Sequence, residues 1–399
     1  MPSILAPGVF IEEVDSGARP IEAVGTSTAG FVGPAPNPAA RPDEAVAVNS
    51  WPEFLKIYGG EGAPGGDLAN AVYGFFLNGG SRCYVVNSKP GAALAGGGKG
   101  LDALAVIDEI AIIAAPGRTD PAAYADLIAA AERLGDRIAI LDGPKEAAEL
   151  RLLTETGQAG EPAEAGDGAK GKAKTGLRPP SSDRGYGAFY FPWILGSDAV
   201  NADPRKPVAI PPSGHIAGVY ARTDAERGVH KAPANASLRG ALGLTQQVAR
   251  AEQAELNEAG VNCIRFFPQD GIRVWGARTL APKGSNWRYL NVRRLFNMIE
   301  ESIAESTRWV VFEPNDRPLW QQIRRDVGAF LTLLWRQGAL AGAKPEEAFF
   351  VKCDEETNPP DVVDAGQVVT LIGVAPVKPA EFVIFRIGQS AAATTIEAA

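Results

Sequence analysis

Apolar residues repeat at helical spacing in two segments of the last third of the chain. In residues 292–303 they fall at offsets 0, 3, 4, 7 and 11, and in residues 319–334 at offsets 0, 4, 8, 11, 12 and 15. Each set lies on one face of an α-helix. Asp316 can cap the start of the second helix and Gly338 can end it. We predict two amphipathic helices, separated by a short strand in WVVFEP (residues 309–314).

Earlier in the chain, the apolar residues form continuous runs rather than helical stripes. The runs 111–117, 137–142 and 187–196 are predicted strands, and residues 122–134 between the first two are a predicted helix. Long apolar strands that alternate with a helix are typical of parallel pairing with both faces of the sheet covered. Residues 50–90 add a smaller α/β unit of the same kind.

Strand-like segments lie near the two ends of the chain, and the N-terminal one has no local partner. VFIEEV (residues 9–14) is followed by glycine- and proline-rich sequence up to residue 42, and EFVIFRIG (residues 381–388) comes just before the end of the chain. An isolated strand must pair with a distant segment or with another molecule. We therefore predict that the N-terminal residues are an arm that contributes its strand elsewhere.

These patterns predict a mixed α/β and α+β protein made of several regions. Residues 155–185 are low in apolar residues and rich in Gly, Ala, Pro and charge, which is typical of a surface insertion. The predicted regions are an N-terminal arm (1–30), an N-terminal α/β part (31–100), a central domain that contains the insertion (101–284), a C-terminal domain (285–388) and a flexible tail (389–399).

Composition excludes several classes of function. The 399 residues carry a formal net charge of −8, which argues against nucleic acid as the main partner. No uncharged apolar run approaches the ~18 residues that would suggest a membrane span, and the first residues lack the features of a signal peptide. The three cysteines form neither a disulfide framework nor a close-spaced metal cluster. We therefore expect synthesis in a reducing compartment.

Two motifs suggest chemistry at first sight but fail in detail. Gly96 to Lys99 (GGGK) lacks the first glycine of a phosphate loop, and Gly100 occupies the position of its Ser or Thr. Ser213 lies two residues before His215, a spacing that by itself makes no catalytic pair, so we expect a structural loop there. We expect a surface or loop hydrogen bond for His230. We predict no catalytic residue, cofactor or metal.

The predicted helix 319–334 carries a charged and polar patch opposite its apolar face. Its residues are Gln321, Gln322, Arg324 and Arg325. The patch is either an ordinary solvated surface or a basic stripe that contacts an acidic partner. A second basic cluster, formed by Arg288, Arg293 and Arg294, could serve in the same way.

Residues 207–244 (PVAIPPSGHIAGVYARTDAERGVHKAPANASLRGALGL) and 256–280 (LNEAGVNCIRFFPQDGIRVWGARTL) are distinctive. This sequence resembles the sheath proteins of contractile tails in myophages, R-type bacteriocins and phage-tail-like injection systems. The segments 7–14, 25–33, 75–86, 291–354 and 374–387 resemble the same family. The resemblance covers nearly the whole chain and leaves out the insertion at 155–185.

The resemblance implies a structural function. Sheath proteins assemble as stacked hexameric rings around an inner tube and contract from a metastable extended state. Their central domain is similar to subtilisin without its catalytic triad, and their terminal arms add strands to the C-terminal domain of neighbours. The corresponding residues in this chain are Val9, Phe10, Ile11, Glu12, Val14, Phe382, Val383, Ile384, Phe385 and Ile387.

The resemblance also implies a set of partners. A helix of the C-terminal domain attaches the sheath to the tube, which would place Gln321, Gln322, Arg324 and Arg325 at that contact. The partners would be copies of the chain itself, the inner tube protein, and baseplate and tail terminator or cap proteins, with no nucleic acid and no direct membrane insertion. Synthesis and assembly would occur in the bacterial cytoplasm, and the product would be a phage tail or an injection particle.

Two alternatives remain open on the sequence. One is a subtilisin-like or nucleotide-dependent hydrolase, which would require chemistry at His215 or at the loop of Gly96 to Lys99. The other is a non-contractile shell or binding protein built on the same fold.

Overall fold

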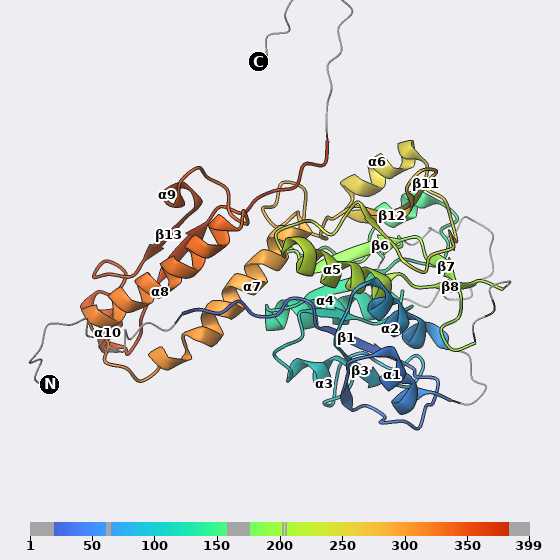
Figure 1. Ribbon diagram of the computed structural model, residues 1–399, viewed down its shortest axis with the longest axis horizontal. Coiled ribbons are helices and arrows are strands. Elements are labelled where there is room, and N and C mark those ends of the chain that lie inside the picture. The colour runs from blue at the N-terminus through green and yellow to red at the C-terminus, as the bar shows by residue number, and fades with distance from the viewer. Residues whose placement is uncertain (1–19, 61–64, 158–175, 202, 204–205, 383–399) are drawn as a thin grey trace, which may run out of the picture.

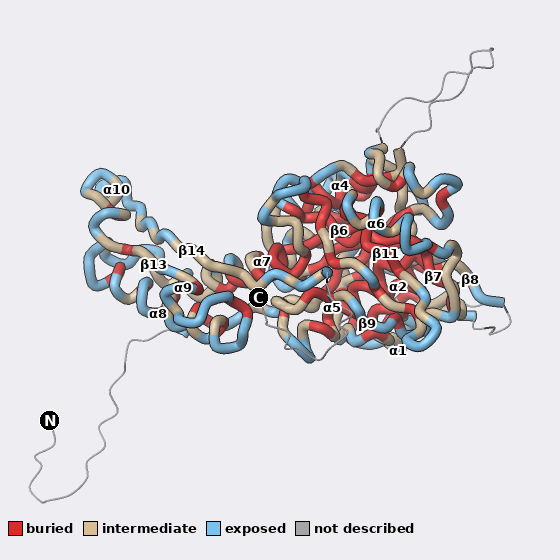
Figure 2. Tube along the Cα trace, turned by 90° about the horizontal axis from the view of Figure 1, so that it is seen from above, coloured by how far each residue is buried: buried red, intermediate tan, exposed pale blue. Residues whose placement is uncertain are grey.

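The chain forms two lobes that are connected by one long helix. The computed structural model describes residues 20–60, 65–157, 176–201, 203 and 206–382. Figure 1 shows a larger α/β body and a smaller C-terminal lobe, with helix α7 (Leu290–Ser306) reaching from one to the other. Buried residues are concentrated in the body (Figure 2).

A nine-stranded sheet forms the centre of the body, in the order β2-β3-β1-β4-β5-β6-β11-β12-β9. The six strands from β3 to β11 are parallel, and β2, β12 and β9 are antiparallel at the two edges. The strands are β1 (Ala29–Gly33), β2 (Ala45–Val48), β3 (Cys83–Asn87), β4 (Ile112–Ala114), β5 (Ile138–Asp142), β6 (Gly187–Phe191), β9 (Ala236–Ser237), β11 (Val261–Phe267) and β12 (Gly271–Trp275).

Helices cover both faces of this sheet, as the continuous apolar strands predicted. One apolar core lies under α1 (Trp51–Tyr58), α2 (Gly66–Asn78) and α5 (Ser213–Arg227). The other lies under α3 (Leu101–Ala105), α4 (Pro121–Leu134) and α6 (Arg250–Glu258), near the short 3-10 helix η1 (Leu150–Thr154). Strands of residues 31–100 and of residues 101–284 belong to this single sheet, so it extends across both predicted regions.

Helices α2 and α5 lie unusually close together because glycines line their contact. A Cβ atom on Gly214 would come 2.1 Å from the carbonyl oxygen of Ala71, and one on Gly218 would come 2.5 Å from that of Phe75. No side chain fits at such distances, so only glycine permits this backbone approach.

Several sequence-based predictions were wrong in detail. Residues 187–196 are not one strand, because the chain breaks at Pro192, which has no N–H for the ladder. The second half of this segment, β7 (Ile194–Gly196), pairs with β8 (Val208–Ile210) and β10 (Gly243–Leu244) in a separate three-stranded sheet.

Two segments take a different structure from the predicted one. Ser213 and His215 are not in a loop: Pro212 is the N-cap of α5, and both residues lie in its first turn. WVVFEP is not a strand: it contains the 3-10 helix η2 (Arg308–Val310) and a turn in which Phe312 has φ of 72°. The apolar side chains of Trp309 and Val310 in this segment pack against the core of the C-terminal lobe, which explains why the segment is apolar without being a strand.

The C-terminal lobe follows the predicted helical pattern closely. Its main helix α8 (Arg317–Arg336) is capped by the side chain of Asp316, which accepts a hydrogen bond from the amide of Leu319 at 3.1 Å. The lobe is completed by α9 (Pro345–Ala348), β13 (Phe349–Lys352), α10 (Pro360–Asp364) and β14 (Leu371–Val374). Its apolar core lies between α7, α8 and the two strands.

Two buried arginines at the start of α7 fix this helix to the body. The guanidinium of Arg294 donates to both carboxylate oxygens of Asp224 in α5, at 2.9 and 2.6 Å, and lies 4.6 Å from the ring centre of Tyr220. Arg293 is fully buried, with its guanidinium 4.2 Å from the ring centre of Trp287.

The proposed basic contact cluster of Arg288, Arg293 and Arg294 is therefore wrong. Arg288 is half-buried and donates to the carbonyl oxygens of Ala281 and Glu258. These three side chains contact other residues of the same chain, and they form no basic stripe at the surface. Among the described residues, no helix is long and apolar enough to cross a membrane.

We expect Asp224→Ala to lower the free energy of unfolding by about 3–5 kcal/mol, because it leaves the charge of Arg294 buried without its partner. Urea denaturation measures this loss. Glu44→Ala is the matched control: it removes the exposed Arg41–Glu44 pair, in which both side chains are more than half exposed, and should cost less than about 1 kcal/mol. Equal, small losses in both variants would contradict the assigned role of the buried pair.

Candidate assembly surfaces

Most residues of the two predicted arms lie outside the described part of the chain. This holds for Val9, Phe10, Ile11, Glu12, Val14, Val383, Ile384, Phe385 and Ile387. Phe382 is described, and 74% of it is exposed. The assignment of all these residues to strand exchange stays a prediction, but the structure does place the root of each arm.

The root of the N-terminal arm runs along α7 (Figure 1). The amide of Glu22 donates to the hydroxyl of Ser306 at 3.2 Å, and that of Val24 to the hydroxyl of Ser302 at 3.0 Å. Ile21 is buried in the core of the C-terminal lobe. The hydroxyl of Thr26 donates to Asp224 in the body at 2.6 Å. Residues 20–28 therefore connect both lobes before the chain enters β1.

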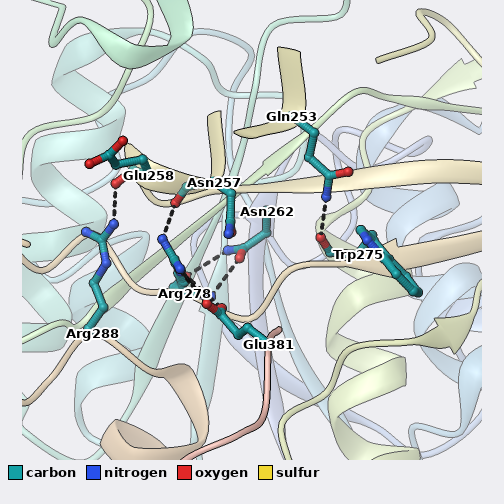
Figure 3. Close-up of polar contacts among 8 residues, drawn as sticks. All are labelled: Gln253, Asn257, Glu258, Asn262, Trp275, Arg278, Arg288 and Glu381. Atoms are coloured by element: carbon teal, nitrogen blue, oxygen red, sulfur yellow. Dashed lines mark hydrogen bonds and ion pairs between the residues drawn. The ribbon is translucent and has the colours of Figure 1, made fainter. Parts of the chain in front are cut away.

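The root of the C-terminal arm also crosses between the lobes. We call residues 375–381 the C-terminal strap. Its backbone pairs with Ala339, Ala341 and Ala348 of the C-terminal lobe, and Asn291 at the start of α7 donates to the carbonyl of Val377 at 3.0 Å. At its far end, the carboxylate of Glu381 accepts from the guanidinium of Arg278 in the body (Figure 3).

The sheet of the C-terminal lobe can accept further strands. It consists of β13 and β14 alone, paired antiparallel, and no third named strand joins them in the described residues. One face packs toward α8, whereas Phe350 and Leu371 on the other face are each 53% exposed. A two-stranded sheet is marginal by itself and leaves backbone donors and acceptors at its outer edges.

The four residues predicted to contact an inner tube occupy the solvent side of α8. Gln321, Arg324 and Arg325 are exposed, and Gln322 is half-buried. Arg325 forms an ion pair of 3.0 Å with Asp326, its neighbour on the same helix. Gln321 and Arg324 also line a shallow groove whose other side is acidic, with residues Asp354, Glu355 and Glu356. The structure thus places the patch at the surface, with mixed charges beside it.

The loop of Gly96 to Lys99 is already occupied by internal partners. The amides of Gly96 and Gly98 donate to the carboxylate of Asp102 at 2.9 and 3.4 Å, and Lys99 pairs with Asp43 at 2.9 Å. A phosphate would have to displace a carboxylate that is part of the same chain. The arrangement supports a closed turn.

Ser213 and His215 do not form a catalytic pair. The hydroxyl and the amide of Ser213 both donate to the buried carboxylate of Asp142, each at 2.7 Å. Burial raises the pKa of Asp142 to about 7, although these hydrogen bonds act in the opposite direction. Asp142 thereby holds the start of α5 at the end of β5, which is a structural role.

His215 is fully enclosed between α2 and α5. A Cβ atom on Gly74 would come 2.1 Å from its Nδ1 atom, and this nitrogen has no hydrogen-bond partner among the residues that the structure describes. Burial lowers the pKa of His215 to about 4, so the ring is neutral at pH 7. The second histidine, His230, lies half-buried in a turn. Among the described residues, no group of three or more His, Cys, Asp or Glu side chains could hold a metal ion.

Several of these structural contacts could not be predicted from the sequence. Asp142 and Ser213 are separated by 71 residues, and Arg278 and Glu381 by 103. Each of these side chains resembles an ordinary surface residue when it is viewed with its sequence neighbours. Only the fold brings them together.

Family models match most of the chain. The model for the phage tail sheath protein central domain matches residues 93–280, and the model for the phage tail sheath C-terminal domain matches residues 282–390. The boundary between the two models falls in the segment that leads into α7. A curated relative is the tail sheath protein of Vibrio phage KVP40, which is 30% identical over 177 residues. That alignment covers 44% of this chain and 26% of the phage protein.

Solved structures match over nearly the full length. The sheath complex of the extracellular contractile injection system PVC, in the contracted state, is 32% identical with a TM-score of 0.76, covering 97% of this chain and 98% of that one. The helical sheath of the anti-feeding prophage, also contracted, is 31% identical with a TM-score of 0.74, covering 97% and 99% of the two chains.

The lowered pKa of His215 predicts a loss of stability in mild acid. The unfolded chain takes up a proton near pH 6.5, whereas the folded chain does so only near pH 4. The contribution of neutral His215 to the free energy of unfolding is therefore complete above pH 6.5 and is lost progressively as the pH decreases toward 4. A pKa difference of this size corresponds to about 3 kcal/mol at pH 4. Denaturation at a series of pH values measures it.

His215→Gln should flatten this pH dependence between 6.5 and 4, whatever its effect at pH 7. His230→Gln is the comparison variant: burial also lowers the pKa of His230, but this ring is only half-buried, so the variant should flatten the profile less than His215→Gln. Asp142, whose pKa is raised, changes stability in the opposite direction, so each variant must be compared with the unmodified protein. An unchanged acid profile in His215→Gln would contradict the assignment.

Proposed function

The chain belongs to the phage tail sheath family, and from this premise we propose that it polymerises as stacked hexameric rings around an inner tube. The sheath would assemble in an extended, metastable state and contract to drive the tube through a target envelope. The observation that carries the proposal is the open β13–β14 sheet, which lies in a lobe reached by the roots of both arms.

Strand exchange is the proposed link between subunits. The N-terminal segment Val9 to Val14 and the C-terminal segment Phe382 to Ile387 would add strands to β13 and β14 of neighbouring copies. Main-chain hydrogen bonds formed in this way do not depend on a precise fit of side chains. They can therefore persist while the bodies of the subunits rotate from one packing to another.

Contraction would need no nucleotide. The contracted lattice would have better subunit contacts than the extended one, so that each ring, once released, biases the next. A gain on the order of a few kcal/mol per subunit, typical of coupling between sites, would add up over many subunits. A signal from the baseplate would start the change, and terminator or cap proteins would close the other end.

The α/β body would act as a scaffold with a subtilisin-like fold and without catalysis. Ser213 is held by Asp142, and His215 is buried and neutral at pH 7, which together support a structural role. The hydrolase alternative needs a reactive group at one of these positions. The solvent side of α8 would contact the inner tube through Gln321, Gln322, Arg324 and Arg325. Synthesis and assembly would take place in the bacterial cytoplasm, with no nucleic-acid partner and no membrane insertion.

Deletion of residues 1–19 should leave a folded monomer that builds no tubes, because the donated strand is lost. Circular dichroism checks the fold, and negative-stain electron microscopy checks for tubes. Deletion of residues 389–399 is the matched control and should leave assembly intact. Tubes of normal length from the N-terminal deletion would exclude strand exchange by that arm.

A single residue can test the main-chain nature of the exchange. Ile11→Pro should prevent assembly, since proline cannot donate to a ladder, whereas Ile11→Val should permit it.

The double variant Arg324→Glu, Arg325→Glu should weaken co-assembly with the inner tube but spare polymers of the sheath protein alone. If each reversed charge costs about 1 kcal/mol, the two together cost about 2 kcal/mol, and binding to the tube should fall about thirtyfold. Co-sedimentation with purified tubes measures the effect. Arg41→Glu with Lys56→Glu, two exposed positions on the body, provides a control of equal charge. Unchanged co-sedimentation of the α8 variant would remove α8 from the tube contact.

A further inference from the structure

The far end of the C-terminal strap is held by a nearly buried ion pair. The guanidinium Nε of Arg278 lies 3.0 and 3.1 Å from the two carboxylate oxygens of Glu381, and Nη2 bonds one of them as well. The two side chains are only 12% and 16% exposed. A bidentate contact of this kind fixes the orientation of both groups. Because the pair is mostly buried, salt screens it little.

Arg278 is itself held rigidly by the body (Figure 3). The fully buried side chain of Asn262, in β11, accepts from the amide of Arg278 at 2.7 Å and donates to its carbonyl at 2.8 Å. A further guanidinium nitrogen of Arg278 donates to the carbonyl of Asn257, in α6, at 2.8 Å. The site that binds Glu381 is thus formed by a strand, a helix and a loop of the body together.

The position of Glu381 gives this pair a consequence beyond local stability. Within the described part of the chain, the last hydrogen bonds of the strap before Glu381 are at Val377, whose amide donates to the carbonyl of Ala339 and whose carbonyl accepts from Asn291. After it comes Phe382, which is exposed and begins the predicted C-terminal strand. Glu381 therefore holds the chain directly before the residues that are predicted to form the exchanged strand.

We propose that Arg278 and Glu381 form a clamp that fixes the root of the C-terminal arm on the α/β body. This inference rests on the proposed strand exchange, in which the arm reaches a second copy of this chain. The clamp sets the place and direction from which the arm departs. It also passes force between neighbouring copies into the nine-stranded sheet and protects β14 from being peeled off its partner strand.

The size of the effect follows from chain geometry. Without the clamp, the next fixed point is Val377, four residues earlier. Four extended residues span about 13 Å, so the root of the arm could move by roughly that distance. A sheath lattice needs each arm to reach its neighbour in one register. Subunits without the clamp would therefore connect in many registers and lose helical order.

The test uses full-length Glu381→Ala and, as a milder change of the same shape, Glu381→Gln. Glu346→Ala removes an exposed carboxylate of the same lobe and is the control. Hydrogen exchange of the Val377 amide, which donates to the carbonyl of Ala339, should rise by about tenfold in the Glu381→Ala monomer, the factor that corresponds to the loss of one ion pair of about 1.4 kcal/mol. The melting temperature of the monomer should stay within a few degrees of the unmodified value.

Electron microscopy of the polymers is the decisive readout. Glu381→Ala should give polymers without a single helical lattice, Glu381→Gln an intermediate result, and Glu346→Ala the normal lattice. Arg278→Gln should reproduce the defect of Glu381→Ala from the other side of the pair. A normal lattice in both Glu381→Ala and Arg278→Gln would overturn the clamp.

A truncation after Glu381 separates this inference from the proposed function. If the truncated chain builds no polymers while Glu381→Ala keeps the normal lattice, strand exchange stands and the clamp is wrong. If the truncated chain polymerises with the normal lattice, strand exchange by the C-terminal arm is itself wrong.

Discussion

The attachment of α7 to the body through two buried arginines is the constraint on which the rest of the structure depends. Arg294 is paired with Asp224, and Arg293 lies against Trp287 and Tyr186 in a site closed to solvent. A guanidinium group loses its hydration when it is buried, and its partners in the protein offset that loss. Moving the group away from these partners would therefore cost free energy. Helix α7 is therefore fixed where it leaves the body, and it carries the C-terminal lobe at a set position.

The other links between the lobes run beside this helix. Residues 20–28 bond Ser302 and Ser306 on α7, and the C-terminal strap bonds Asn291 at its start and ends on Arg278. Both arms thus begin from segments that are fixed to α7 and to the body. Under the proposed strand exchange, this arrangement would let each arm transmit a rotation, because a tether transmits a rotation only when its root does not move.

The sequence predicted the local pattern well and the long-range contacts poorly. The apolar spacing predicted α7 and α8, and the continuous apolar runs predicted buried parallel strands, because both signals come from neighbours within a few turns. Arg293 and Arg294 were interpreted as surface residues, because their burial depends on partners such as Asp224, 70 residues away. WVVFEP has the composition of a strand, but Trp309 and Val310 pack into the lobe core instead.

The most direct test of the central claim is electron microscopy of this protein expressed alone and together with its inner tube protein. The account predicts hollow tubes with a helical surface lattice in both cases. The tubes should have two distinct diameters, narrower when the inner tube holds the sheath extended and wider when it is absent. Dispersed particles under both conditions, or a single diameter in both, would contradict a contractile sheath.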